Sequence, residues 1–154
     1  MDYVEGWFNS LGNRTNLDKI CDSLRKDPSL CVYIGTDSHV HNNCTYFAIA
    51  ICILRKGKGG NFFIKKFQEN LDYQQEMSYR LLKEVSNSID IALMLRKKIP
   101  NKQITIHIDV NENQKHKSST HTKRLVSFVK AMGFVCETKP NSWASFSVAD
   151  KFTK

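Results

Sequence analysis

Two aspartates stand where short apolar stretches of the chain give way to polar residues. Asp37 ends the stretch that begins at Cys31, and Asp109 ends an alternating stretch that begins at Gln103. Both stretches are short and rich in Val, Ile or Thr, which predicts buried strands. Ligands of α/β proteins gather outside the carboxyl ends of parallel strands. If these two strands are parallel neighbours, the two carboxylates lie side by side.

Two further acids are expected to face inward from helices. Glu84 shares a helix face with Ser88 and Ala92, whose small side chains permit close approach to a sheet. Asp150 shares a face with Trp143, which is typical of a stripe that faces the core. An inward acid is costly unless something pairs with it. For each acid taken alone, a strand-end cap or an exposed helix position is the alternative interpretation.

The chemistry of such a set of acids is the binding of divalent cations. Carboxylates held within a few ångströms repel one another, and Mg²⁺ prefers oxygen ligands. Two such ions can activate water and stabilise the leaving oxygen of a phosphodiester. The chain carries 23 Lys and Arg against 15 Asp and Glu, a net charge of +8. A basic protein with an acidic pocket is therefore predicted to be suited to phosphodiester hydrolysis on a polyanion.

The rest of the pattern predicts one α/β domain over residues 1–154, with an N-terminal helical extension over about residues 1–28. In this extension, Thr15-Asn16 is expected to cap a helix that runs to about Lys26. Strands are expected at 31–37, 45–54, 61–68, 103–109 and 134–139, and helices at about 72–98, 118–132 and from 142 onward. Hairpins make the first three strands antiparallel, and crossover helices make the last two parallel. The expected fold is a mixed five-stranded sheet flanked by helices, with Lys65 and Lys66 at a sheet edge.

Several classes of protein are excluded or disfavoured. The longest apolar run, Ala48–Leu54, is far shorter than the ~20 residues of a membrane helix. The first residues show no secretory pattern. Five cysteines without a C-x-x-C pair favour reduced thiols and a cytoplasmic protein. Because the histidines and these thiols do not combine in a ligand pattern, a zinc site is disfavoured.

Several motifs, taken in this order of elements, resemble the ribonuclease H-like superfamily and, more narrowly, the YkuK family of predicted ribonuclease H-like proteins. The likeness spans roughly residues 30 to 154. The residues that carry it are Ile34-Gly-Thr-Asp-Ser38, Arg55-Lys-Gly-Lys-Gly59, Glu84 with Ser88 and Ala92, Ile106-His-Ile-Asp-Val110, Ser142-Trp-Ala-Ser and Ala149-Asp-Lys-Phe-Thr-Lys154.

The resemblance implies a ribonuclease H-like fold and a two-metal nuclease that acts on RNA or an RNA/DNA hybrid. Its metal-binding and catalytic acids would be Asp37, Glu84, Asp109 and Asp150, holding Mg²⁺ or Mn²⁺. The loop over residues 138–142 lacks the histidine that ribonuclease H enzymes often carry there. The chain also lacks the inserted basic handle with which some of them hold a hybrid.

Substrate contacts are predicted beside these acids, at Ser38, Asn111, Lys117 and Lys151. Lys117 belongs to a basic, hydroxyl-rich segment before a predicted helix, where anions bind readily. Glu76 competes with Glu84 for the helix position, but an acid in a first turn is favoured by the helix dipole anyway. Two other functions stay open: a non-catalytic nucleic-acid-binding module on the same fold, and a protein-interaction or phosphate-metabolite domain.

Overall fold

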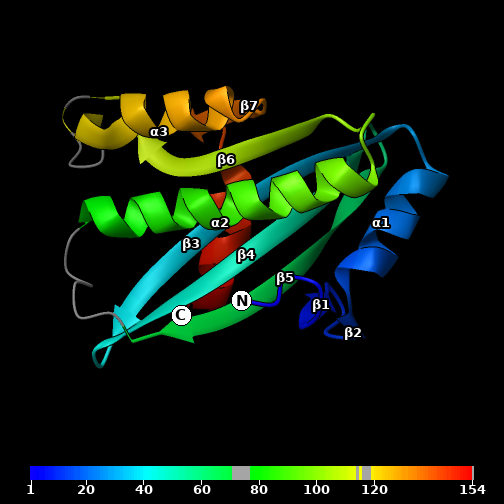
Figure 1. The fold of residues 1–154 in the computed structure, drawn as a ribbon, viewed down its shortest axis with the longest axis horizontal. Coiled ribbons are helices and arrows are strands. Elements are labelled where there is room, and N and C mark those ends of the chain that lie inside the picture. Colours follow the sequence, from blue (N-terminus) through cyan, green and yellow to red (C-terminus); the bar gives the residue numbers. More distant parts are fainter. Residues whose placement is uncertain (71–76, 114, 116–118, 154) are drawn as a thin grey trace.

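The computed structural model describes residues 1–70, 77–113, 115 and 119–153. Seven strands form one mixed sheet in the order β2-β1-β5-β4-β3-β6-β7 (Figure 1). The strands are β1 Trp7–Asn9, β2 Arg14–Thr15, β3 Leu30–His41, β4 Cys44–Arg55, β5 Gly59–Glu69, β6 Ile104–Asn111 and β7 Val135–Lys139. The helices are α1 Leu17–Lys26, α2 Met77–Lys98, α3 Ser119–Ala131, the π-helix η1 Ala144–Ala149 and α4 Asp150–Thr153.

The five long strands follow the expected order and directions. β3, β4 and β5 are antiparallel neighbours, and β6 and β7 run parallel to β3 and to each other. The expected total of five strands is wrong, because the N-terminal segment adds two more. β1 pairs antiparallel with β5, and β2 pairs with β1. Strands of two and three residues are too short to show a hydrophobic period, so the sequence pattern does not reveal them.

The added strands also change the environment of one lysine. Lys65 lies opposite Trp7 across the β1–β5 pair and is only 8 % exposed. Its ammonium donates to the backbone carbonyl of Glu5 at 2.5 Å. The expected edge position is therefore wrong for Lys65, because β1 covers that side of β5, whereas its neighbour Lys66 is exposed.

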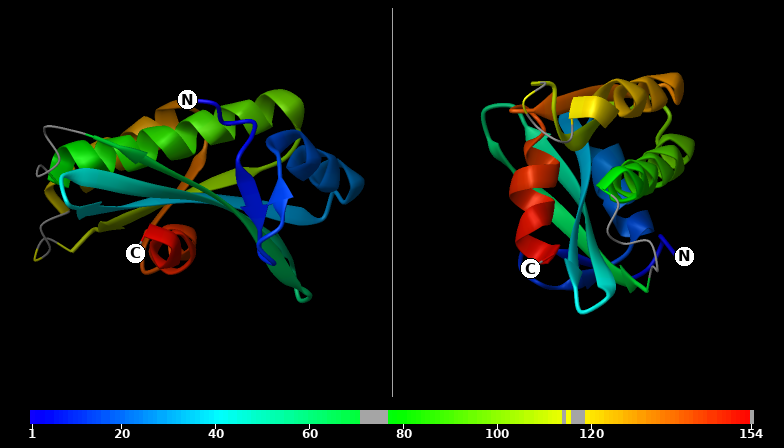
Figure 2. Two further views of the ribbon diagram at one scale, coloured as in Figure 1. Left: turned by 90° about the horizontal axis from the view of Figure 1, so that it is seen from below. Right: turned by 90° about the vertical axis from the view of Figure 1, so that its left-hand side faces the viewer.

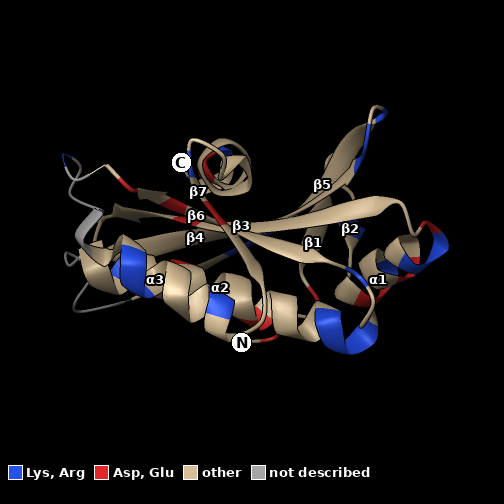
Figure 3. Cartoon of the chain, turned by 90° about the horizontal axis from the view of Figure 1, so that it is seen from above, with Lys and Arg blue, Asp and Glu red and all other residues tan. Residues whose placement is uncertain are grey.

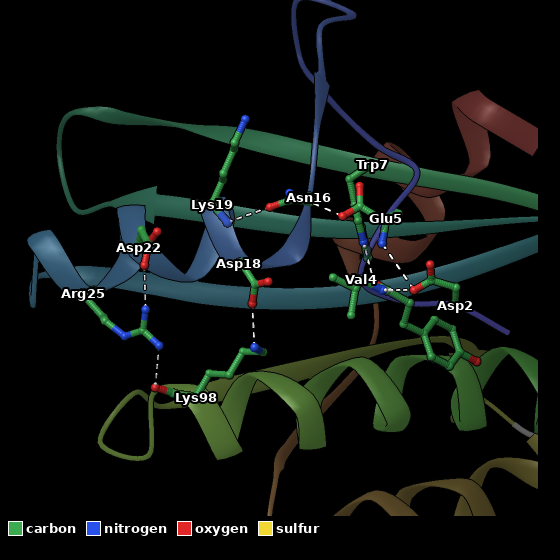
Figure 4. Close-up of polar contacts among 11 residues, drawn as sticks. Asp2, Val4, Glu5, Trp7, Asn16, Asp18, Lys19, Asp22, Arg25 and Lys98 are labelled. Carbon is green, nitrogen blue, oxygen red and sulfur yellow. Dashed lines mark hydrogen bonds and ion pairs between the residues drawn. The ribbon is translucent and has the colours of Figure 1, made fainter.

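The N-terminal segment is joined to the main domain by polar contacts (Figure 4). The Asn16 side chain caps α1 by accepting from the backbone nitrogen of Lys19 at 3.0 Å, as the sequence predicts for this helix start. Lys98, the last residue of α2, meets Asp18 of α1 at 2.5 Å, and its carbonyl accepts from Arg25 at 3.0 Å. These contacts hold α1 against the C-terminal end of α2.

Helices cover both faces of the sheet. α1, α2 and α3 lie on one face, whereas η1 and α4 lie alone on the other (Figure 2). The larger core lies under α1 and α2 and includes Leu24, Ile91 and Ile106. A smaller core lies under η1 and includes Ala48, Ala50 and Ala144. In the part of the chain that the structure describes, every helix is too short or too polar to cross a bilayer.

The C-terminal helical segment packs unusually closely on the centre of the sheet. A Cβ atom added at Gly35 of β3 would lie 2.4 Å from the backbone nitrogen of Ser145. His107 of β6 accepts a hydrogen bond from the backbone nitrogen of Ala144 at 3.0 Å through its Nδ1 atom. The rings of His107, Tyr33 and Trp143 pack together, with 5.1 Å between the centroids of each pair. The absence of a side chain at residue 35 thus fixes how near η1 lies to β3.

We predict that Gly35→Ala destabilises the fold by about 1–3 kcal/mol, because the new methyl group meets backbone that cannot rotate away. Amide hydrogen exchange over residues 144–153 should become faster, and denaturant unfolding measures the loss of stability. Gly12→Ala is the control, since its positive φ makes it costly but no atom lies within 4 Å of the new methyl group. Equal protection of residues 144–153 in both variants would contradict the prediction.

Candidate active site

Asp37 of β3 and Asp109 of β6 lie just beyond the point where these two strands stop pairing. The expected strand ends at residues 37 and 109 are wrong, because β3 continues to His41 and β6 to Asn111. The parallel register runs from Val32↔Ile104 to Gly35↔His107. Asp37 and Asp109 each follow two residues later, so by alternation they lie on the same face of the sheet as Gly35 and His107, the face that η1 covers. Beyond this point the two strands diverge (Figure 1). The condition under which the two carboxylates were expected to lie side by side, namely that these strands are parallel neighbours, is therefore met.

Asp37 is held from the C-terminal helix. Its carboxylate oxygen Oδ2 accepts a hydrogen bond from the Thr153 hydroxyl at 2.9 Å, and the residue is only 8 % exposed. The pKa of Asp37 is raised to about 6, mainly by burial and in addition by the nearby charges of Asp109 and Asp150, whereas the Thr153 hydrogen bond lowers it. Asp37 is therefore a carboxylate whose ionisation is opposed by its surroundings.

Glu84 reaches the same region from α2, on the opposite face of the sheet. It is 5 % exposed and accepts a hydrogen bond from the Ser38 hydroxyl at 2.6 Å. Arg80 donates to the Ser38 hydroxyl at 3.1 Å and to the Ser38 carbonyl at 2.8 Å. The pKa of Glu84 is raised to about 8, mainly by burial and in addition by the charges of Asp37 and Asp109, whereas the Ser38 hydrogen bond and the charge of Arg80 lower it.

Asp109 has an internal counter-ion. The ammonium of Lys139, the last residue of β7, lies 2.5 Å from its Oδ1 atom. The same ammonium lies 5.9 Å from the centre of the Phe146 ring on η1. The β6–β7 register is irregular between His107 and Asn111, so Asp109 lies in a locally distorted part of the sheet. Lys139 therefore neutralises one acid of the predicted set from within the chain.

The four acids are brought to one end of the central strands, but from both faces of the sheet. The charges of other acids in the set contribute to two of the raised pKa values. Asp109 and Asp150 raise the pKa of Asp37, and Asp37 and Asp109 raise the pKa of Glu84. Glu84 approaches from the α2 face and Asp150 from the α4 face, and Asp37 is the member that links them. Figure 3 shows acidic positions on both the central strands and the C-terminal helical segment.

The predicted substrate contacts have different environments. Ser38 is buried and its hydroxyl is used between Glu84 and Arg80. Asn111 accepts from the Thr122 hydroxyl through its carbonyl, at 3.2 Å, and from the backbone of residue 113 through its side chain. Lys151 is exposed on α4. Lys117 and Glu76 lie outside the described residues.

Sequence reasoning missed Thr153, which holds Asp37, although it follows Asp150 by three residues, a spacing that places two side chains near each other on a helix. It also assigned no partner to Glu84, whose hydrogen bond comes from Ser38. That contact joins residues 46 positions apart in the chain, so no local pattern indicates it.

The donor set fits a hard divalent cation in its chemistry. All four acids offer carboxylate oxygens, which suit Mg²⁺ and Mn²⁺. The pKa values of Asp37 and Glu84 are raised mainly by burial and in part by neighbouring carboxylates, whose repulsion a cation would relieve. Within the described residues, no three Asp, Glu, His or Cys side chains are arranged as a metal-ligand group. Lys139, Thr153 and Ser38 each hold one acid in its present position.

A sequence model of the ribonuclease H-like family matches residues 16–154. The chain therefore belongs to the ribonuclease H-like family, in agreement with its mixed sheet and flanking helices. It is also 25 % identical over 154 aligned positions to YkuK of Bacillus subtilis (strain 168), a protein described as uncharacterized, with 90 % of this chain and 88 % of that protein covered. This relative confirms the resemblance to YkuK proteins. No solved structure matches the chain significantly.

The raised pKa of Glu84 predicts a specific pH dependence of stability. The folded chain binds this proton more tightly than the unfolded chain, where the pKa is near 4.5, so stability falls as pH rises toward about 8. Between pH of about 7 and 8, Glu84 makes the largest contribution to this slope, because the pKa of Asp37 and both the folded and the ordinary pKa of His107 lie below this range. Glu84→Gln should flatten this slope in urea unfolding of the metal-free protein.

The matched control is Asp22→Asn, which removes a carboxylate that is 60 % exposed and pairs with Arg25 on the same helix. That variant should keep the wild-type slope. Parallel stability curves for wild type and Glu84→Gln across this pH range would show that Glu84 is not protonated in the folded protein.

Proposed function

We propose that the protein is a metal-dependent nuclease that hydrolyses phosphodiester bonds in RNA or an RNA/DNA hybrid. The observation that carries the proposal is the buried Asp37, which lies in the central strand just beyond its pairing with β6 and whose ionisation is opposed by burial and by the charges of Asp109 and Asp150. A structural carboxylate would be expected to have a cation or several hydrogen-bond donors in place of two acidic neighbours. Membership of the ribonuclease H-like family supports the same chemistry.

In this proposal, Asp37, Glu84, Asp109 and Asp150 hold two Mg²⁺ or Mn²⁺ ions. Bound cations of this kind supply an activated water and neutralise charge on the scissile phosphate and its leaving oxygen. The chain's own residues position the ligands. Thr153 orients Asp37, and Ser38 with Arg80 orients Glu84. Lys139 holds Asp109 when no cation competes for it.

The substrate in this proposal is a polyanion, which the net charge of +8 favours. Lys151, exposed one residue after Asp150, is proposed to contact substrate phosphates together with Asn111 and Lys117. Ser38 contributes to the site indirectly, through its hydrogen bond to Glu84.

The five cysteines are all free, which supports a reducing, cytoplasmic compartment.

The direct test replaces Asp37. Asp37→Asn should reduce Mg²⁺-dependent cleavage of labelled RNA and RNA/DNA hybrid by about 100-fold or more, because loss of even an outer-shell residue costs metal sites up to that factor. Mn²⁺ should raise the melting temperature of the wild type, and this rise should be lost in the variant. The exposed Asp22→Asn serves as the control and should behave as wild type in both assays.

A wild-type protein whose melting temperature does not respond to millimolar Mg²⁺ or Mn²⁺, and which cleaves neither substrate, would reject the nuclease. So would cleavage that persists unchanged in Asp37→Asn.

A second function is favoured by one observation. Asp109, Asp37 and Glu84 already interact within the chain, with Lys139, Thr153 and Ser38 respectively. This arrangement suits a non-catalytic nucleic-acid-binding module on the same fold. Such a module predicts salt-sensitive binding that survives both a chelator and Asp37→Asn, without turnover.

Lys139 offers a test that separates a metal site from an internal ion pair. If Asp109 binds the cation, Lys139 competes with it, and Lys139→Met should lower the Mg²⁺ concentration for half-maximal stabilisation by about two- to fivefold, the value of a partly exposed ion pair. Thermal unfolding against Mg²⁺ concentration measures this. Lys97→Met on the exposed side of α2 controls for net charge. A shift of equal size in both variants would show that Asp109 is no ligand.

A further inference from the structure

A cavity of about 620 Å³ opens beside the candidate site, on the face of the sheet that η1 and α4 cover. Its size is typical of small-molecule pockets. Thr153, which holds Asp37, is part of its wall. The cavity is lined by His39, His41, Tyr46, Phe47, Lys66, Phe67, Gln68, Phe152 and Thr153.

The cavity combines aromatic surface with positive charge and hydrogen-bond donors. Tyr46 and Phe152 are half-buried, so each keeps part of its ring accessible. The Lys66 ammonium lies 5.8 Å from the centre of the Phe152 ring and is exposed. His39 lies directly opposite Tyr46 in the β3–β4 pair. None of the described residues that line this cavity is acidic, in contrast to the neighbouring site.

Strand geometry makes the cavity continuous with the acids. Asp37, His39 and His41 alternate along β3 and so point to the same face of the sheet. Successive members of this row are about 7 Å apart along the strand. A chain of phosphates that reaches Asp37 therefore passes the histidines and Lys66 at the next positions.

We propose that this cavity binds an unpaired nucleobase of a single-stranded segment, next to the phosphate that lies at Asp37. The proposal rests on the proposed function and adds a preference for unpaired over paired strands. Base stacking on aromatic side chains is sequence-tolerant and common in single-strand binding, and Lys66 with the histidines supplies contacts to the backbone. A base inside a duplex is stacked on its neighbours and cannot enter a cavity without leaving the helix.

The test measures binding in EDTA, where no cleavage competes. Three fluorescent probes of equal length are compared: a single-stranded RNA, the same strand with abasic sugars throughout, and a blunt RNA/DNA hybrid. The wild type should bind the RNA about tenfold more tightly than the abasic strand, a factor in the range of one stacked base. It should also bind the hybrid more weakly than the single strand.

Tyr46→Ala and Phe152→Ala should each remove this preference for bases while leaving affinity for the abasic strand unchanged. Lys66→Gln should weaken binding of the RNA and the abasic strand alike. Phe8→Ala and Lys58→Gln are the matched controls, on β1 and the β4–β5 turn, and should bind as wild type. Because Phe152 packs against Phe62, its variant can lose stability, and Tyr46→Ala then decides the outcome.

Equal wild-type affinity for the RNA and the abasic strand would overturn the proposal. So would a hybrid that binds as tightly as the single strand, or a preference that survives Tyr46→Ala. The two proposals fail separately. Cleavage without any base preference rejects only the cavity, whereas base preference without Mg²⁺-dependent cleavage rejects only the nuclease.

Discussion

The contact between the backbone of η1 and β3 at Gly35 is the constraint on which the candidate site depends. A larger residue at this position would meet Ser145, so the C-terminal helical segment can approach the central strand only because a side chain is missing. His107 adds a hydrogen bond to the start of the same segment. With η1 seated there, α4 follows directly and brings Asp150 and Thr153 to Asp37. The acids of the last helix and of the central strand therefore meet as a consequence of packing.

In the candidate site, repulsion between carboxylates opposes their ionisation, and a few hydrogen-bond donors favour it. Burial and mutual repulsion raise the pKa values of Asp37 and Glu84, and Thr153 and Ser38 each supply one opposing hydrogen bond. Lys139 neutralises Asp109 directly. In the proposed nuclease, a hard cation would replace Thr153, Ser38 and Lys139 as the partner of these carboxylates. In a non-catalytic nucleic-acid-binding module, these three residues would remain the partners.

The side chains of β3 point alternately to the two faces of the sheet, and the two sets have different roles. Thr36 and Ser38 face α2, where Thr36 meets Ser88 at 2.8 Å and Ser38 meets Glu84. Gly35 and Asp37 face η1 and α4, and the row continues through His39 into the aromatic cavity. One strand thus builds the support for the helix acid on one side and the proposed path of the substrate on the other. The ribonuclease H-like family supplies the framework, and the cavity is the part from which we infer a preference for an unpaired base.

Local pattern alone determined the five long strands, their directions and the start of α1, because hydrophobic period, turn residues and the Asn16 cap act within a few residues of the chain. It also located Asp37 and Asp109 next to the point where β3 and β6 stop pairing, because polar residues replace apolar ones there, but it ended β3 too early, since that strand continues to His41. Tertiary structure alone decided that β1 covers β5 and buries Lys65, that Thr153 and Ser38 are the partners of Asp37 and Glu84, and that Glu84 and Asp150 approach from opposite faces. These features depend on contacts between residues distant in the chain. Such contacts follow no period in the sequence, so a local pattern does not predict them.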